Sequence, residues 1–294
     1  MDTLARIEQA LDATIATHEV PGAPPRLTAA VRHAVFPGGA RIRPQLCLAV
    51  AHACGMDDPA LAMAAACAIE LLHCASLVHD DLPCFDDASM RRGRPSVQAA
   101  FGEPLAVLAG DGLIVLAFQS IAAAAGRSPL RLAPVLTTIA QGTGMPFGIV
   151  AGQAWECEPR VTLAEYQRAK TGALFAAATA VGAQAAGGDA RTWRALGDRL
   201  GEAYQVADDI RDVLSDPAVL GKPIGQDAAL GRPSAAQELG LGGAIRHFES
   251  LVQGAIDAIP ACAGAPRLRA LVRMESERLV PKSMCEDAAR RVAA

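Results

Sequence analysis

The chain has 294 residues, of which 51% are apolar, and a formal net charge of −4. This length can bury a large core in one large domain or in two smaller ones. The mild acidity disfavours a nucleic-acid-binding protein, which would normally carry a basic face. The mean hydropathy of +0.23 is high for a soluble protein. The excess of apolar residues indicates helices buried on most sides, an apolar cavity, or both.

The apolar residues fall in short runs. The richest runs are residues 61–69, 105–110 and 112–118, and none approaches the roughly 18 residues that a membrane span needs. We therefore predict no transmembrane segment. Residues 1–20 carry acids and a helical apolar period, without the basic start and apolar centre of a signal peptide. They predict the first helix of the mature chain.

Helical patterns continue along the chain, with apolar residues recurring at i, i+3 and i+4. Strand-like alternation is scarce, and no Asn-Gly or Asp-Gly hairpin signal stands between strand-like runs. We predict a single all-α domain over residues 1–294, a bundle of about ten or more helices. The helices are separated by breaks rich in Gly and Pro, at residues 21–25, 37–39, 55–59, 93–95, 126–129, 187–188, 217–223, 231–233 and 260–266.

The eight cysteines form no CxxC pair and follow no metal-ligand spacing. Most of them lie in apolar runs, so we interpret them as small core residues. They favour a reducing, cytoplasmic setting. Their positions are Cys47, Cys54, Cys67, Cys74, Cys84, Cys157, Cys262 and Cys285.

The stretch HDDLPCFDD, residues 79–87, ends an apolar helical segment with four carboxylates. One interpretation is a solvated acidic turn, and the other is a cation site. Pro83 should disturb the helix at this point. The distortion would bring Asp80 and Asp86 to one ion despite their six-residue spacing.

A second acidic stretch, residues 205–216, lies on another helical segment. Asp208 and Asp212 stand at i and i+4, so their Cβ atoms lie about 5–6 Å apart on one face. Two carboxylates this close repel each other and need a counter-charge when they are half buried. Arg211 should point elsewhere on the helix, whereas a divalent ion shared with substrate phosphates would meet the need. Two such stretches favour cation sites over solvated turns.

Basic residues accompany the acidic stretches in compact motifs. Arginine presents a fork that suits phosphate, and lysine presents a compact point charge. Acids for Mg²⁺, bases for phosphate and apolar helices behind them predict a pocket for a diphosphate with an apolar tail. The basic residues of these motifs are Arg41, Arg43, Arg91, Arg92, Arg94, Lys170 and Lys222.

With these motifs, the chain resembles the trans-isoprenyl diphosphate synthase (polyprenyl synthetase) family. Within that family it resembles the bacterial geranylgeranyl diphosphate synthases of the carotenoid and bacteriochlorophyll type. The resemblance runs from about residue 25 to residue 240. It rests on HDDLPCFDD with RRGRPS as the first aspartate-rich motif, on DDIRD as the second, and on PGGARIRP, AVLAGDGL, GQAWE, KTGALF and GKPIGQD in matching order. It implies the isoprenoid synthase type I fold, an all-helical homodimer whose two acidic motifs face each other across a central cavity.

The resemblance also implies residue roles. Catalysis would depend on Asp80, Asp81, Asp86, Lys170, Asp208 and Asp209. Three Mg²⁺ ions would be held by Asp80, Asp86, Asp208 and Asp212. The allylic diphosphate would contact Arg91, Lys170, Thr171, Gln205, Lys222 and Arg232, and isopentenyl diphosphate would contact Arg43, His73 and Arg92. On its own, His73 would be interpreted as a core histidine.

The implied reaction begins when the allylic C–O bond ionises, because Mg²⁺ and basic groups stabilise the departing diphosphate. The double bond of isopentenyl diphosphate attacks the carbocation, and a proton is then lost to the released diphosphate. Apolar walls exclude water from the cation. The allylic substrate would be dimethylallyl, geranyl or farnesyl diphosphate.

Product length is argued from the residues that precede the first acidic motif. In the family, a bulky aromatic residue five positions before this motif stops growth at the C15 product. Here Ala75 and then Ser76 occupy this place, and both are small. The growing tail should run down the preceding helix, so we predict a C20 product, with Leu72 and deeper residues setting the final stop. A small residue needed only for helix packing is the alternative for Ala75.

Three positions depart from the family pattern: Ala40 replaces Lys, Glu156 replaces Asp, and Arg232 stands in a segment that usually contains Lys. Arg41 would compensate for Ala40, or the affinity for isopentenyl diphosphate would be lower. The alternatives are a farnesyl diphosphate or other chain-length product, a catalytically silent partner subunit, a terpene cyclase, and a calcium-binding helical protein. Two intact acidic motifs argue against the silent subunit, and a second basic group argues against the cyclase. The motif lysines argue against calcium binding.

Overall fold

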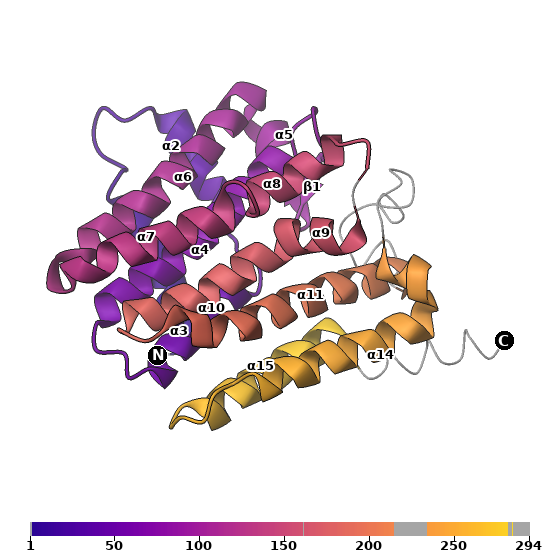
Figure 1. The fold of residues 1–294 in the computed structure, drawn as a ribbon. Coiled ribbons are helices and arrows are strands. Elements are labelled where there is room, and N and C mark those ends of the chain that lie inside the picture. Colours follow the sequence, from indigo (N-terminus) through magenta and orange to yellow (C-terminus); the bar gives the residue numbers. More distant parts are fainter. Residues whose placement is uncertain (1, 161, 215–233, 282–283, 285–294) are drawn as a thin grey trace. The chain divides into compact units, whose positions relative to one another are not determined.

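The computed structural model describes residues 2–160, 162–214, 234–281 and 284. The described chain is helical almost throughout, which confirms the predicted all-α class (Figure 1). It divides into two compact units, one formed by Met1–Ile139 with Val181–Gly188 and the other by Ala140–Ala180 with Asp189–Ala294. A single domain over residues 1–294 stays a prediction.

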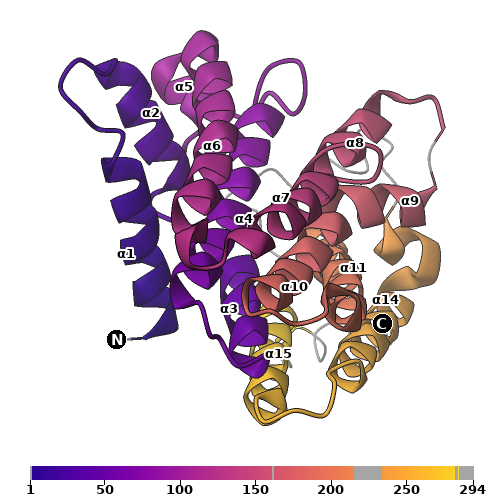
Figure 2. The same cartoon turned by 60° about the vertical axis from the view of Figure 1, so that its left-hand side comes forward.

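The first unit is built around one long apolar helix, α4. This helix packs against α6, α3, α1 and α2, and Figure 2 shows α1, α2 and α6 in the indigo-to-magenta part of the chain. The elements are α1 (Thr3–Ala16), α2 (Pro25–Val35), α3 (Ile42–Ala53), α4 (Pro59–Asp80), β1 (Met90–Arg91), β2 (Arg94–Pro95), α5 (Val97–Phe101), α6 (Glu103–Ala124), η1 (Ala125–Arg127) and the start of α7 (Pro129–Thr143).

The limits of α4 follow from its sequence. The Asp58 side chain accepts a hydrogen bond from the Leu61 N–H at 3.1 Å, and Pro59 stands at the first helical position. Residues 65–72 are all buried, so this part of the helix is covered on every side. The high apolar content of the sequence is therefore explained here by a central helix, one of the two expected causes.

The second unit contains two long antiparallel partners, α11 and α14, that lie side by side (Figure 1). Helix α14 is interrupted at Gly240, whose φ is +65°. The elements are the end of α7, α8 (Ile149–Ala154), η2 (Trp155–Cys157), α9 (Leu163–Gln167), the π-helical turn η3 (Arg168–Gly172), most of α10 (Ala173–Ala185), α11 (Ala190–Leu214), α14 (Ala235–Asp257) and α15 (Ala265–Leu279).

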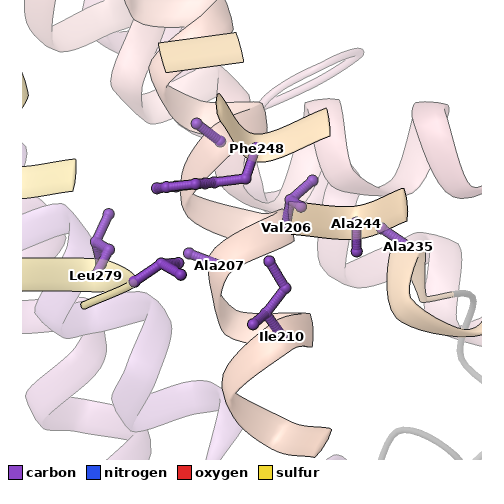
Figure 3. Packing of buried hydrophobic residues seen from close by; sticks show 9 residues of the cluster. Val206, Ala207, Ile210, Ala235, Ala244, Phe248 and Leu279 are labelled. Carbon is purple, nitrogen blue, oxygen red and sulfur yellow. The ribbon is translucent and has the colours of Figure 1, made fainter. Parts of the chain in front are cut away.

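An apolar cluster joins the long helices of the second unit (Figure 3). Val206 and Ile210 of α11 pack with Phe248 of α14 and Leu279 of α15. These residues of α11 recur at i and i+4, so they form one apolar stripe along the helix. The stripe fixes the rotation of α11 and therefore decides which faces of the second acidic motif are buried.

A short β-hairpin interrupts the helices between Met90 and Pro95, where no strand was predicted. β1 pairs with β2 antiparallel, and the turn between them is Arg92-Gly93. Both turn residues have positive φ, 52° for Arg92 and 75° for Gly93. This conformation suits a two-residue hairpin loop, in which Asn-Gly is the commoner sequence. The hairpin carried no Asn-Gly or Asp-Gly signal because Arg takes the place of Asn.

Two helices are long and apolar enough to cross a membrane by length and composition: Pro59–Asp80, and Glu103–Arg127 with α6 and η1. Both have a mean hydropathy of 1.9 over a window of 18 residues. The buried share of this window is 72% in Pro59–Asp80 and 39% in Glu103–Arg127. Polar residues interrupt both helices, Glu70 and His73 in the first and Asp111 in the second, so neither contains an uninterrupted apolar run of this length. The absence of a membrane span stays a prediction.

Among the described residues, no cysteine belongs to a disulfide. Cys47, Cys67 and Cys74 are buried, as predicted, and burial raises the pKa of Cys74 to about 11. Cys84 and Cys157 are exposed instead, because Cys84 lies in the turn that follows α4 and Cys157 ends η2, which follows α8. The interpretation of the cysteines as core residues therefore holds for three of them and is wrong for these two.

Candidate active site

The first acidic stretch lies where α4 ends. The helix stops at Asp80, three residues before Pro83. The turn that follows is closed by backbone hydrogen bonds, in which the Asp86 N–H donates to the Asp80 carbonyl at 3.0 Å and the Asp87 N–H donates to the Leu82 carbonyl at 3.1 Å. Carboxylate oxygens of Asp80 and Asp86 lie within 4.8 Å of each other. The turn therefore brings together the two aspartates predicted to share an ion.

Asp81 turns into the first unit instead. Its side chain is only 3% exposed, and Arg91 Nε donates to its Oδ1 at 2.9 Å. Burial raises the pKa of Asp81, and the Arg91 guanidinium opposes this shift without cancelling it. Gln98 Nε2 donates to the Asp81 carbonyl at 2.9 Å. Asp81 thus holds Arg91, a predicted contact of the allylic diphosphate, beside the acidic turn.

The hairpin places Arg92 against the loop that precedes α3. A Cβ atom at Gly39 would lie 3.3 Å from Arg92 Nε. The guanidinium therefore lies over the loop backbone because residue 39 has no side chain. The same loop leads to Arg43, which is half-buried in the first turn of α3. The glycine of PGGARIRP thus explains how two separate basic motifs meet.

His73 lies on α4 among these cations. Its pKa is held well below the ordinary value, first by burial and then by the positive charges of Arg43 and Arg92, with smaller effects from Arg91 and Arg41. Such an effect requires the guanidinium groups to lie close to the imidazole. The first unit therefore gathers the three residues predicted to bind isopentenyl diphosphate.

Arg41 does not take the place of the lysine that is missing at position 40. Its guanidinium is buried and donates to Glu70 Oε1 at 2.6 Å, to Glu8 Oε1 at 2.8 Å and to the Val35 carbonyl at 2.7 Å. Burial lowers the pKa of Arg41, but the Glu8 and Glu70 carboxylates raise it above its ordinary value. The expectation that Arg41 compensates was wrong, because this side chain joins α1, α4 and the end of α2.

The second acidic stretch lies on α11. Asp208 and Asp212 are both half-buried, and their i and i+4 spacing puts them on one face. Arg211 Nη1 lies 3.6 Å from Asp208 Oδ1. The prediction that Arg211 points elsewhere was therefore wrong, because residues at i and i+3 are also neighbours on a helix. Asp208 has a partial counter-charge within its own helix.

Asp209 points away from that face into the second unit. It is 4% exposed, and it accepts hydrogen bonds from Gln205 Nε2 at 3.1 Å, from Gln167 Nε2 at 3.2 Å and from the Ala235 N–H at 2.7 Å. Gln205 Oε1 in turn accepts from the Thr171 hydroxyl at 2.8 Å. Two predicted contacts of the allylic diphosphate, Thr171 and Gln205, are thus joined to the acidic motif.

Lys170 and Thr171 lie in the π-helical turn η3. Lys170 Nζ forms a short ion pair with Glu156 Oε1, which also accepts from the Tyr166 hydroxyl at 2.6 Å. The Lys170 ammonium lies 5.7 Å from the centre of the Tyr166 ring. Single π-helical turns are frequent at functional sites. Glu156, which departs from the family pattern, therefore keeps a role because its carboxylate holds Lys170.

Two glycines let neighbouring helices approach this turn. A Cβ atom at Gly152 in α8 would lie 2.3 Å from the backbone of Lys170, and one at Gly201 in α11 would lie 2.5 Å from the Cα of Gly172. Neither place has room for a methyl group. Helices α8 and α11 therefore pack directly on η3 and fix the backbone that carries Lys170 and Thr171.

The predicted chain-length residues lie on α4 before the acidic turn. Ala75 and Leu72 are buried, and the half-buried Ser76 donates its hydroxyl proton to the His73 carbonyl at 2.8 Å. Ala75 precedes Asp80 by five residues, which is about 7.5 Å along the helix axis. Its role in setting product length stays a prediction.

The predicted site residues therefore fall into two groups. Lys222 and Arg232 lie outside the described residues. The facing arrangement of the two acidic motifs stays a prediction, since each motif belongs to a different unit. The first unit carries Asp80, Asp81, Asp86, Arg43, His73, Arg91 and Arg92, and the second carries Lys170, Thr171, Gln205, Asp208, Asp209 and Asp212.

Several partners of these residues were missed in the sequence. Tyr166 stands four residues before Lys170, and this spacing was a usable signal. Gln167 contacts Asp209, 42 residues further along, and carried no local signal. The Glu8 and Glu70 partners of Arg41 carried no such signal, because they are distant from it in the chain.

The comparison with known proteins agrees with these motifs. The family model described as "Polyprenyl synthetase" matches residues 24–244. The chain is 55% identical to the geranylgeranyl diphosphate synthase of Cereibacter sphaeroides over 94% of this chain and 96% of that protein. It is 49% identical to the geranylgeranyl diphosphate synthase of Rhodobacter capsulatus over 94% of this chain and 95% of that protein.

A solved structure with a similar fold is that of a geranyltransferase from Helicobacter pylori, complexed with magnesium and isoprenyl diphosphate. Its TM-score is 0.78 at 27% sequence identity, and the match covers 93% of this chain and 97% of that one. The fold, the order of the motifs and the extent of both sequence matches agree, so the chain belongs to the polyprenyl synthetase family.

Proposed function

We propose that this protein is a trans-prenyltransferase that condenses isopentenyl diphosphate with an allylic diphosphate to give geranylgeranyl diphosphate. The observation that carries this proposal is that the first unit contains two kinds of site. One is the Asp80–Asp86 carboxylate pair, and the other is the pair of cations Arg43 and Arg92 whose charges act on His73. A metal-bound diphosphate and a second diphosphate need these two kinds of site. The 55% identity to a geranylgeranyl diphosphate synthase supports the same reaction and product.

The carboxylate pair fits Mg²⁺. This ion takes oxygen ligands at about 2.0–2.1 Å, so opposite ligands lie about 4.2 Å apart. Oxygens of Asp80 and Asp86 within 4.8 Å of each other meet this requirement after a small side-chain movement. We propose three ions, held by Asp80 and Asp86 of the first motif and by Asp208 and Asp212 of the second. When bound, Mg²⁺ supplies positive charge that stabilises the leaving diphosphate.

The residues of the chain then bind and orient the two substrates. The allylic C–O bond breaks with its electron pair leaving on the diphosphate, and the alkene of isopentenyl diphosphate forms the new C–C bond. A proton leaves the carbon next to the new bond and is taken up by the released diphosphate. Basic groups hold the departing charge, namely Arg91, Lys170, Lys222 and Arg232. Thr171 and Gln205 contact the allylic substrate beside them.

Product analysis tests the reaction and its chain length together. Purified protein with Mg²⁺ and isopentenyl diphosphate is given dimethylallyl, geranyl or farnesyl diphosphate, and the products are separated by chromatography. We expect a C20 product from the wild type and a C15 product from Ala75→Tyr, because the larger ring would block the tail. The matched control is Ala64→Tyr, about three helical turns further from the acidic turn, at a half-buried place on the same helix.

Each other result has its own meaning. A C15 or longer product from the wild type would retain the chemistry and contradict the proposed role of Ala75. No product with any allylic substrate would favour the silent partner subunit, and a cyclic product from one diphosphate would favour the terpene cyclase.

We also propose a homodimer, supported by the apolar outer face of α6. Val107, Leu108 and Val115 are 41%, 50% and 56% exposed on this helix. Apolar surface of this kind marks an interface, and a second copy of this chain is the proposed occupant. A reducing cytoplasmic setting is proposed because the described cysteines form no disulfide. The resemblance to carotenoid and bacteriochlorophyll-type enzymes makes a pigment branch the proposed consumer of the product.

A further inference from the structure

A chain of hydrogen bonds in the second unit runs from Thr171 through Gln205 to Asp209. The Thr171 hydroxyl donates to Gln205 Oε1 at 2.8 Å, and Gln205 Nε2 donates to Asp209 Oδ1 at 3.1 Å. The other carboxylate oxygen of Asp209 accepts from the Ala235 N–H at 2.7 Å and from Gln167 Nε2 at 3.2 Å. These hydrogen bonds join η3, α11 and the first residue of α14 within one compact unit.

The direction of this chain is fixed by chemistry. A backbone N–H can only donate, and an ionised carboxylate can only accept. Gln205 must therefore turn its NH₂ group toward Asp209 and its carbonyl toward Thr171. A threonine hydroxyl has a single proton, and Thr171 donates that proton to Gln205. Its oxygen then offers only lone pairs to any other neighbour.

We propose that Asp209 is a positioning residue that sets the direction of this chain and so makes Thr171 an obligate hydrogen-bond acceptor. The inference rests on the proposed prenyl-transfer function and deepens it. A bare diphosphate oxygen cannot accept a proton from a threonine whose proton is already donated. Thr171 therefore faces a donor or a positively charged group on the substrate side, and Lys170 beside it supplies the positive charge that a diphosphate needs.

Burial makes this direction matter. Asp209 is 4% exposed and Thr171 is 9% exposed, so water does not readily replace a reversed hydrogen bond. Close packing of α11 on η3 at Gly201 also prevents the two partners from separating. The wild-type series of hydrogen bonds therefore has one direction, and its reversal requires a substitution that changes a donor or an acceptor.

Exchanging the carboxylate and the amide tests the inference. In Asp209→Asn, the Ala235 N–H still requires an acceptor, so the asparagine carbonyl faces Ala235 and its NH₂ group faces Gln205. The Gln205 side chain must then turn its own carbonyl toward the asparagine and its NH₂ group toward Thr171. Thr171 then accepts from Gln205. In Asp209→Asn combined with Gln205→Glu, the carboxylate at 205 accepts from both neighbours, and Thr171 donates again. Charge and side-chain size are conserved across the pair.

We expect Asp209→Asn to lower kcat about tenfold, with a smaller change in KM for the allylic diphosphate. The double variant should recover kcat to within about threefold of the wild type. Gln167→Met is the matched control, because it removes a donor to Asp209 without touching the chain. It should lower Tm by about 2–4 °C, as Asp209→Asn does, and leave kcat unchanged.

Two results would overturn the inference. One is an Asp209→Asn variant whose Tm falls while its kcat is unchanged. This result would show that Asp209 stabilises the start of α14 and has no effect on Thr171. The other is a double variant no more active than the worse single variant. If Asp209→Asn does not fold, Thr171→Ser and Thr171→Val replace it. Serine should keep kcat and valine should lose it, and an equal loss in both contradicts the proposal.

Thermal unfolding separates this inference from the proposed function. If the wild type makes no prenyl product, the proposed function fails. The wild type, Asp209→Asn, Gln205→Glu and the double variant still test the series of hydrogen bonds. The double variant should regain the Tm that each single variant loses. Additive losses of Tm would reject the chain itself, whatever the activity.

Discussion

Arg41 is a buried cation whose partners come from three separate parts of the first unit. Its side chain is fully buried, and that of Glu70 is 3% exposed. A Cβ atom at Gly38 would lie 2.1 Å from the Arg41 guanidinium carbon, so the first glycine of PGGARIRP makes room for it. The motif thus contains one arginine for the fold, Arg41, and one for the predicted substrate, Arg43.

Replacement of Arg41 should destabilise the protein strongly. Arg41→Met leaves the Glu70 carboxylate buried without its partner, and we expect the free energy of unfolding to fall by about 3–5 kcal/mol. Urea unfolding followed by circular dichroism measures this. Arg41→Met with Glu70→Leu should regain much of the loss, because no buried charge remains. A loss below about 1 kcal/mol in the single variant would contradict this account.

His73 should make stability depend on pH. Its pKa is lowered in the folded protein, so the unfolded chain takes up a proton near pH 6.5 while the folded chain does not. The contribution of His73 is therefore constant above this pH, and stability is lost as the pH falls below it. Urea unfolding from about pH 7.5 to 5 should show a decline that is shallower in His73→Gln. Parallel curves for the two proteins would show that His73 titrates normally.

At the scale of elements, the turn η3 depends on close contact with α11. Gly201→Ala would force a methyl group to within 2.5 Å of the Gly172 Cα. We expect a loss of about 1–3 kcal/mol in stability and a fall in kcat, because Thr171 and Gln205 move apart. Differential scanning calorimetry and product assays measure both effects.

Gly242→Ala in α14 is the matched control for Gly201. Its Cβ atom would meet only Arg246 Nη1 at 3.6 Å, an ordinary contact. Alanine is also the better helix former, so this variant should gain about 0.4–1 kcal/mol. Equal effects of the two substitutions would show that helix propensity, and not packing against η3, decides the outcome at Gly201.

The sequence was sufficient to predict the helices and the motifs, and it could have predicted one further feature. Adjacent residues on a helix point about 100° apart, so the two aspartates of an Asp-Asp pair cannot both face the same ion. Asp81 and Asp209 are the inward members, and they hold Arg91 and Gln205. Spacing alone predicts that one aspartate of each pair points away from the ion, whereas its partner is known only from the structure.

Other features depend on tertiary contacts and could not be predicted. Nothing near Arg41 in the chain indicates that Glu8 and Glu70 surround it. The Arg92-Gly93 turn has no Asn-Gly signal, and its positive φ values are stabilised by the hairpin and by Gly39. The π-helical turn has no local sequence signature either, because it is formed by packing against α8 and α11.

At the scale of the whole molecule, the family and the all-α fold are confirmed, while assembly remains to be measured. We expect a mass near twice the 30.3 kDa of the chain in light scattering after size-exclusion chromatography. Leu108→Asp should shift this mass toward the monomer, because a charge would be buried in the interface. A monomeric wild type would contradict the dimer.

Leu239→Asp provides the control for the assembly experiment. Leu239 lies on α14 and is 51% exposed, against 50% for Leu108 on α6. The same charge is thus introduced at the same exposure on another helix. It should leave the mass unchanged, and a shift in both variants would show that added charge alone, and not the α6 face, alters the assembly.

The π-helical turn has an evolutionary consequence. A turn of this kind holds one more residue than the α-helix around it, so it behaves as a one-residue insertion within residues 168–172. Deleting that residue would restore regular winding and keep the helix on either side in register, since the turn absorbs the extra residue, but it would change the directions of the side chains within the turn. The segment can therefore accept amino-acid substitutions but not changes in length, and its length should be inherited unchanged wherever the lysine and threonine keep their places.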